Sequence, residues 1–173
     1  MGNLEIFKID LKGLKDEVTT FEFSLDNDYF EAIGATQVNG GDFSTTLTVR
    51  KTAGAFELRF HSAGTAVVSC DLCLEDMTLP VDTSNKVVAR LGEEYSDDDE
   101  IVTVPADEGT IDVAWLIYEF IALAIPSRHV HAEGECNPDM VSKLESLSAQ
   151  KSSETGATDP RWSALENLKS TIK

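Results

Sequence analysis

The chain has 173 residues, a length that suits one domain with an appendage and allows a sizeable hydrophobic core. Its formal net charge is −17, and its 14 Lys and Arg residues are scattered, which disfavours binding to the phosphates of naked RNA or DNA. No basic N-terminal region precedes an apolar stretch, and the longest apolar run, at 113–125, is too short to span a bilayer. We therefore expect a cytoplasmic protein, away from membranes, with basic partners.

Alternating apolar and polar residues predict strands through the first two thirds of the chain. Turns are expected at 52–54 and 63–64, where glycine follows small or polar residues. A short helix is expected at 29–33, before Gly34. The clearest predicted strands are 18–23, 43–49, 56–60, 66–69, 77–81 and 86–91.

The pattern then changes to a helix at 113–125, with Asp112 as its N-cap. Almost every face of this helix is apolar, so we expect it to be buried against the sheet. Glu119 is the exception, and we expect it at the helix edge, reaching water or a cation rather than acting in catalysis. A second short helix is predicted at 139–147.

The composition shifts again towards the C-terminus. Residues 148–158 contain no large apolar side chain and are predicted to be a flexible linker. Residues 159–173 are predicted to form an amphipathic helix that begins with an Asp-Pro pair. Trp162, Leu165 and Leu168 fall on one side of it, and we expect them to contact a partner.

These elements predict an α+β fold. We expect an antiparallel sheet or a partly closed β-barrel of short strands, packed by one buried helix, with a C-terminal helical tail. The predicted domain covers residues 1–147, followed by the linker and the tail.

Three cysteines are too few for a disulfide scaffold, and two of them form the C-x2-C pair Cys70 and Cys73. The surrounding strands disfavour a thioredoxin-like redox motif. Downstream, Cys136 follows two candidate ligands, His129 and His131, of which only one is expected to bind, since they point to opposite sides of an extended segment. A Cys3His set is a common structural zinc site, whereas buried apolar thiols are the simpler alternative.

Six of the eight residues at 93–100 are acidic, and we interpret this segment as a solvated loop. Its carboxylates would suit Mg²⁺, but consecutive acidic residues on an exposed loop seldom converge on one ion. Phosphate-binding loops and hydrolase motifs are absent from the sequence. His61, alone in a predicted strand, is expected at the surface.

Five segments follow one another in a recognisable order. They are the C-x2-C-L stretch at 68–74, the acidic stretch at 94–99, the helix marked by Ile111, Asp112, Glu119 and 123–126, the His131-x4-Cys136 segment, and Asp-Pro-Arg-Trp-Ser-Ala-Leu at 159–165. Together they resemble the YceD family of large ribosomal RNA accumulation proteins, and the resemblance extends over residues 68–168. The resemblance favours His131 as the fourth metal ligand.

The resemblance implies a bacterial, non-enzymatic ribosome-biogenesis factor that supports accumulation of 23S ribosomal RNA. The acidic charge favours a basic ribosomal protein or a pre-50S particle as partner; direct RNA contact stays open. The alternative is a metal-dependent enzyme acting on RNA, and a redox or zinc-storage protein is the least favoured hypothesis.

Overall fold

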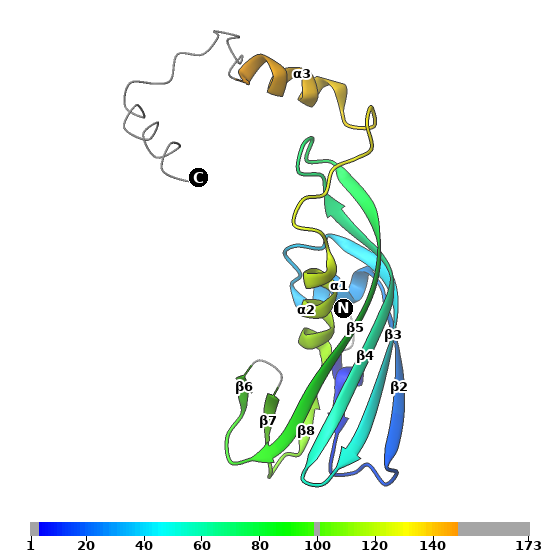
Figure 1. Ribbon diagram of the computed structural model, residues 1–173, viewed down its shortest axis with the longest axis vertical. Helices are drawn as coiled ribbons and strands as arrows, with labels where there is room; N and C mark the ends of the chain where they lie inside the picture. Colours follow the sequence, from blue (N-terminus) through cyan, green and yellow to red (C-terminus); the bar gives the residue numbers. More distant parts are fainter. Residues whose placement is uncertain (1–3, 99–100, 149–173) are drawn as a thin grey trace, which may run out of the picture.

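The computed structural model describes residues 4–98 and 101–148, and its central feature is a long, curved, six-stranded sheet that holds a helix on its concave side (Figure 1). The elements, in chain order, are η1 (Leu4–Phe7), β1 (Lys8–Asp10), β2 (Val18–Leu25), α1 (Asn27–Ile33), β3 (Gly40–Thr52), β4 (Ala55–Ser69), β5 (Asp76–Gly92), β6 (Ser96–Asp98), β7 (Ile101–Pro105), β8 (Thr110–Asp112), α2 (Ala114–Ala124) and α3 (Pro138–Leu147).

The sheet has the strand order β2-β3-β4-β5-β7-β6, and a separate pair joins β1 to β8. All neighbours in the large sheet are antiparallel except β5 and β7, which run parallel. Alternate residues of β3 and β4 are buried, because successive side chains point to opposite faces of a strand. The predicted α+β class is confirmed, as an open sheet rather than a closed barrel.

Two predicted interruptions are wrong, since β4 and β5 are long continuous strands. The turn expected at 63–64 lies within β4, where Gly64 pairs with Phe43 of β3. A Cβ at Gly64 would lie 2.1 Å from the carbonyl oxygen of Asp42, so glycine is needed for close strand approach and not for a turn. The predicted strands 77–81 and 86–91 both belong to β5, whose polar middle still pairs with β4.

Helix α2 packs against the concave side of the sheet, as the apolar run predicted (Figure 1). It buries Leu116, Ile117 and Ile121, and it begins at Ala114. The predicted N-cap is wrong by one residue, because Val113 occupies the cap position and Asp112 ends β8. The Asp112 carboxylate still accepts a hydrogen bond from the amide of Ala114 at 2.9 Å. Among the described residues, no helix is long and apolar enough to cross a membrane.

Two tyrosines tie α1 and the following turn to α2. The buried Tyr29 of α1 donates a hydrogen bond from its hydroxyl to the carbonyl of Ala114 at 2.7 Å. Burial raises the pKa of Tyr29, so this hydroxyl keeps its proton. The hydroxyl of Tyr118 accepts from the amides of Thr36 and Gln37 at 3.2 and 3.3 Å. These hydrogen bonds thus fix α2 against α1 and the turn that follows α1.

The acidic segment differs in part from the predicted loop. Ser96–Asp98 form β6, an edge strand that pairs antiparallel with β7. Backbone hydrogen bonding to the neighbouring strand β7 makes this part of the segment extended, whatever its charge. Glu93 and Glu94 are exposed, as expected. The side chains of residues 97–100 lie outside the described part of the chain.

The helix predicted at 139–147 is α3, Pro138–Leu147, capped by Asn137. Residues 149–173, which hold most of the predicted linker and the whole predicted tail helix, lie outside the described residues. Helix α3 projects from the end of the sheet where β4 and β5 are joined (Figure 1).

Candidate metal centre

The turn that joins β4 to β5 holds the C-x2-C pair in a fixed conformation. The amide of Cys70 donates to the carbonyl of Glu75 at 2.8 Å, and the amide of Leu74 donates to the carbonyl of Cys70 at 2.9 Å. Leu74 has φ 64°, a left-handed conformation that is uncommon for a non-glycine residue. The strained residue closes the turn directly after Cys73, and both cysteines are buried.

The second half of the site comes from the loop at 126–137, between α2 and α3. His131 Nδ1 lies 3.3 Å from the Cys73 sulfur and 3.8 Å from the Cys136 sulfur. The Cys70 and Cys136 sulfurs are 3.8 Å apart. Cys70, Cys73, His131 and Cys136, the metal cluster below, therefore come together from segments about sixty residues apart, with all four ligand atoms within 4.8 Å of one another.

These separations fit one tetrahedral ion. Zn–S bonds of about 2.3 Å and a Zn–N bond of about 2.0 Å imply ligand separations of about 3.8 Å between sulfurs and about 3.5 Å between sulfur and nitrogen. The sulfur–sulfur distance of 3.8 Å and the sulfur–nitrogen distances of 3.3 and 3.8 Å agree with that geometry. The cluster can therefore hold a metal ion without rearrangement of the backbone.

His129, the competing histidine, has a different role. Its amide donates to the carboxylate of Asp71 at 2.7 Å, and its carbonyl accepts from the amide of Asp71 at 2.9 Å. Its ring Nδ1 lies 3.0 Å from the carbonyl oxygen of Pro126. His129 thus joins the 126–137 loop to the β4–β5 turn, and His131, not His129, is the histidine that lies with the three sulfurs.

The protonation of the cluster follows from its surroundings. Burial by itself raises the pKa of Cys70, but hydrogen bonds from the backbone amides of Cys73, His131 and Leu72 outweigh it and lower the pKa to about 6. Burial and the neighbouring sulfurs raise the pKa of Cys136 to about 11, and the sulfur of Cys70 raises that of His131. Of Cys70 and Cys136, Cys70 therefore loses its proton more readily, and the thiolate is the form that binds a cation.

Sequence reasoning did not identify three residues that hold the two halves together. Asp71 lies inside the C-x2-C motif but acts through its bonds to His129. Asn137 donates from its side-chain amide to Glu75 at 2.7 Å, and the Asn137 oxygen also caps α3. The role of Asn137 as a helix cap could have been predicted from the sequence, because a polar residue before proline is typical of a helix start. Its hydrogen bond to Glu75, 62 residues away, leaves no pattern in the local sequence.

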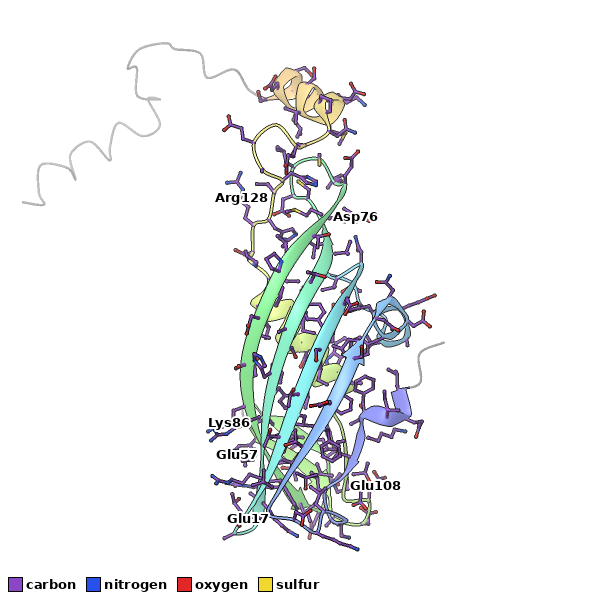
Figure 2. The ribbon with its side chains drawn as sticks, turned by 90° about the vertical axis from the view of Figure 1, so that its right-hand side faces the viewer. Glu17, Glu57, Asp76, Lys86, Glu108 and Arg128 are labelled. Atoms are coloured by element: carbon purple, nitrogen blue, oxygen red, sulfur yellow. The ribbon has the colours of Figure 1, made fainter. Side chains whose placement is uncertain are left out.

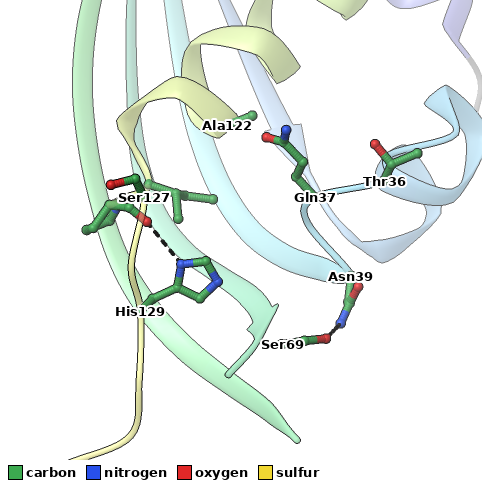
Figure 3. A pocket seen from close by; sticks show the side chains of 9 residues that line it. Thr36, Gln37, Asn39, Ser69, Ala122, Ser127 and His129 are labelled. Carbon is green, nitrogen blue, oxygen red and sulfur yellow. Dashed lines mark hydrogen bonds between the residues drawn. The ribbon is translucent and has the colours of Figure 1, made fainter. Parts of the chain in front are cut away.

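A concavity of about 360 Å³ lies beside the cluster, between the turn after α1, the end of β4 and the end of α2 (Figure 3). Two of its polar side chains, Asn39 and His129, are hydrogen-bonded to neighbouring residues of the protein. Asn39 donates to Ser69 at 3.0 Å and to Asp76 at 2.7 Å, while His129 bonds to Pro126 on the opposite wall (Figure 3). These bonds brace the wall and do not converge on a ligand position.

Other residues singled out in the sequence lie away from the cluster. The carboxylate of Glu119, at the edge of α2, accepts from the indole of Trp115 at 2.7 Å. His61 is exposed on the outer face of the sheet, where it lies 3.1 Å from Ser84. Trp162, Leu165 and Leu168 lie outside the described residues.

A family profile described as large ribosomal RNA subunit accumulation protein YceD matches residues 58–169, nearly two thirds of the chain. The match includes both halves of the metal cluster and the buried helix between them. Comparison with curated proteins and with solved structures gives no match. The chain belongs to the YceD family of large ribosomal RNA subunit accumulation proteins.

Proposed function

We propose that this protein is a non-enzymatic assembly factor in the cytoplasm that supports accumulation of 23S ribosomal RNA. It would do so by binding a basic ribosomal protein or a pre-50S particle. The family assignment supports the link to large-subunit RNA, since the family description names that role. The metal cluster supports a structural role for a bound ion, which would hold together the surface that binds the partner.

Zinc is the proposed ion. Three thiolates and one imidazole form a Cys3His set, which zinc occupies in structural sites with all four positions filled by protein. An ion held in this way has no open position for water or substrate, so its contribution is to folding. Zinc would join the β4–β5 turn to the loop that leads into α3.

The proposed basic partner follows from charge. The chain carries 31 Asp and Glu residues against 14 Lys and Arg residues, so its mean surface potential attracts cations and repels phosphates. Ribosomal proteins are basic, and an acidic factor can bind the basic surface of one of them before that protein binds ribosomal RNA. The second candidate, a metal-dependent enzyme acting on RNA, would need an open metal position and phosphate-binding cations beside it.

Complementation tests the proposal. Cells that lack the gene should have a lower ratio of 23S to 16S ribosomal RNA, and the wild-type gene should restore it. Cys73→Ser should fail to restore the ratio, whereas His61→Ala, which changes a histidine far from the metal cluster, should succeed. Affinity recovery from growing cells, with protein and RNA identified, should yield large-subunit components.

Two results would contradict the proposal. An unchanged 23S to 16S ratio in cells without the gene would remove the link to accumulation. Metal-dependent cleavage of RNA by the purified protein, lost in Cys73→Ser and kept in His61→Ala, would establish the enzymatic alternative.

A further inference from the structure

Helix α3 is amphipathic but has no buried residue. Its apolar side chains recur at helical spacing, and Leu144 and Leu147 are 41% and 83% exposed. A ten-residue helix is marginal in water without a packed face. Asn137 caps its start, and the described residues cover its apolar side only in part: Met140 and Val141 are half-buried, while Leu144 and Leu147 are exposed.

The space beside this helix is an apolar groove of about 410 Å³ between α3 and the loop at 126–137, which carries His131 and Cys136 and is called the metal-binding loop below. Leu72, Val130, Pro138 and Val141 supply apolar walls. Leu72 and Val130 are 39% and 37% exposed, although each is a large aliphatic residue that normally packs in a core. A groove with this lining fits inserted aliphatic or aromatic side chains.

The rim of the groove is acidic. Glu133 and Glu145 line it, and among the described residues no Lys or Arg does. The wider metal-bearing end, residues 70–76 and 127–148, has seven Asp and Glu residues against two Lys and Arg residues. Asp76 and Arg128 mark this end of the molecule, opposite Lys86 and Glu57 (Figure 2). Negative charge around an apolar groove favours a positively charged partner.

We propose that the groove between α3 and the metal-binding loop binds a basic segment of a partner protein through apolar anchor side chains. This inference rests on the proposed function and names the surface at which it operates. A nucleic acid is disfavoured because the rim would repel its phosphates. A second copy of this chain, with its own net charge of −17, is disfavoured for the same reason.

The metal cluster shapes the groove. His131 and Cys136 are part of its lining, and the apolar Leu72 belongs to the turn that holds Cys70 and Cys73. Release of the ion would separate the two walls, so partner binding requires the metal. A structural ion would thereby control recognition without touching the partner.

Site-specific photo-crosslinking tests the proposal with the full-length, zinc-loaded protein. Ser142 is exposed and lines the groove, so it is replaced by a benzophenone amino acid. Ser84 is the matched control, because it is an exposed serine in an open depression of about 470 Å³ on the outer sheet face, lined by Arg59 and Lys86. The probe is total protein extracted from purified 50S subunits, with adducts identified by mass spectrometry.

We expect adducts from position 142 to one or a few basic ribosomal proteins, at least tenfold more than from position 84. They should fall about tenfold in 0.5 M salt and in the double variant Glu133→Gln/Glu145→Gln, since charge contributes to recognition. A chelator should also abolish them. Equal labelling from both positions, or no adduct from position 142, would overturn the proposal.

Adducts to residues 149–173 of the same chain, to a second copy or to ribosomal RNA added with the proteins would each assign the groove another occupant and overturn the proposal. The two proposals can fail separately. Normal complementation without groove adducts refutes the docking site alone. Specific groove adducts from a protein whose loss leaves 23S ribosomal RNA unchanged refute the proposed function alone.

Discussion

Removal of the metal should loosen the loop at 126–137 and helix α3 while the six-stranded sheet stays folded. Apart from contacts to sulfur, three hydrogen bonds between described residues join this loop to the β4–β5 turn: two between Asp71 and His129, and one from Asn137 to Glu75. At about 1 kcal/mol each they contribute about 3 kcal/mol. Ordering the backbone of the 12 loop residues costs about 12 kcal/mol. A structural zinc ion contributes about 10 kcal/mol, which makes up the difference.

Hydrogen exchange measures this effect residue by residue. Chelation removes the contribution of about 10 kcal/mol from the ion, so exchange of the Asp71 and His129 amides should become at least about 1,000-fold faster. The amides of β3 and β4 should change little, since their partners belong to the sheet. Cys136→Ser should reproduce the effect without a chelator.

A uniform acceleration throughout the chain would show that the metal supports the whole fold. Unchanged exchange at Asp71 and His129 would show that the loop is ordered without an ion. Either result would refute the reasoning. His61→Ala, which alters an exposed histidine outside the cluster, should leave exchange in the loop as it is in the wild-type protein.

Three further predictions concern other parts of the structure. Tyr118→Phe removes the hydroxyl that accepts hydrogen bonds from the amides of Thr36 and Gln37. It should lower the free energy of unfolding in urea by about 1–3 kcal/mol, with no loss of bound zinc, and an unchanged midpoint of the urea transition would contradict this. Zinc affinity, measured by competition with a chromophoric chelator, should fall at least tenfold per pH unit below pH 7. The pKa of Cys136 is raised, so zinc binding displaces its proton, and further acidification also protonates Cys70. An affinity independent of pH would count against thiolate ligation. Gly64→Ala places a Cβ against the backbone of β3 and should lower the Tm by roughly 5 °C or more, and a Tm equal to that of the wild type would show that β4 has room there.

Local patterns in the sequence predicted most of the elements. The helix at 113–125 was identifiable because 13 residues carry almost no polar face, and Asp26 and Gly34 bracket α1 as helix caps. The continuity of β4 through Gly64 was not predictable, because glycine favours turns locally and only the paired strand shows that close approach is required. The pairing of Gly64 with Phe43 of β3 keeps the chain extended at this glycine.

The metal cluster was predictable in composition but not in detail. Spacing identified the two half-sites, since Cys70 and Cys73 share a turn and Cys136 follows a histidine. The residues alone left His129 and His131 as alternatives, and the family resemblance favoured His131. In the structure, two bonds between Asp71 and His129 join residues 58 positions apart. Such pairing is set by the fold and leaves no periodic signal in the sequence. The parallel β5–β7 pair escaped prediction for the same reason.

X-ray absorption at the zinc edge, with metal analysis of the purified full-length protein, tests the central claim most directly. We expect one zinc ion per chain, with three sulfur ligands at about 2.3 Å and one nitrogen ligand at about 2.0 Å. His131→Ala should lose the nitrogen contribution, whereas His129→Ala should keep it. Substoichiometric metal, or a first shell of oxygen ligands that is unaffected by Cys136→Ser, would contradict a structural zinc site at this cluster.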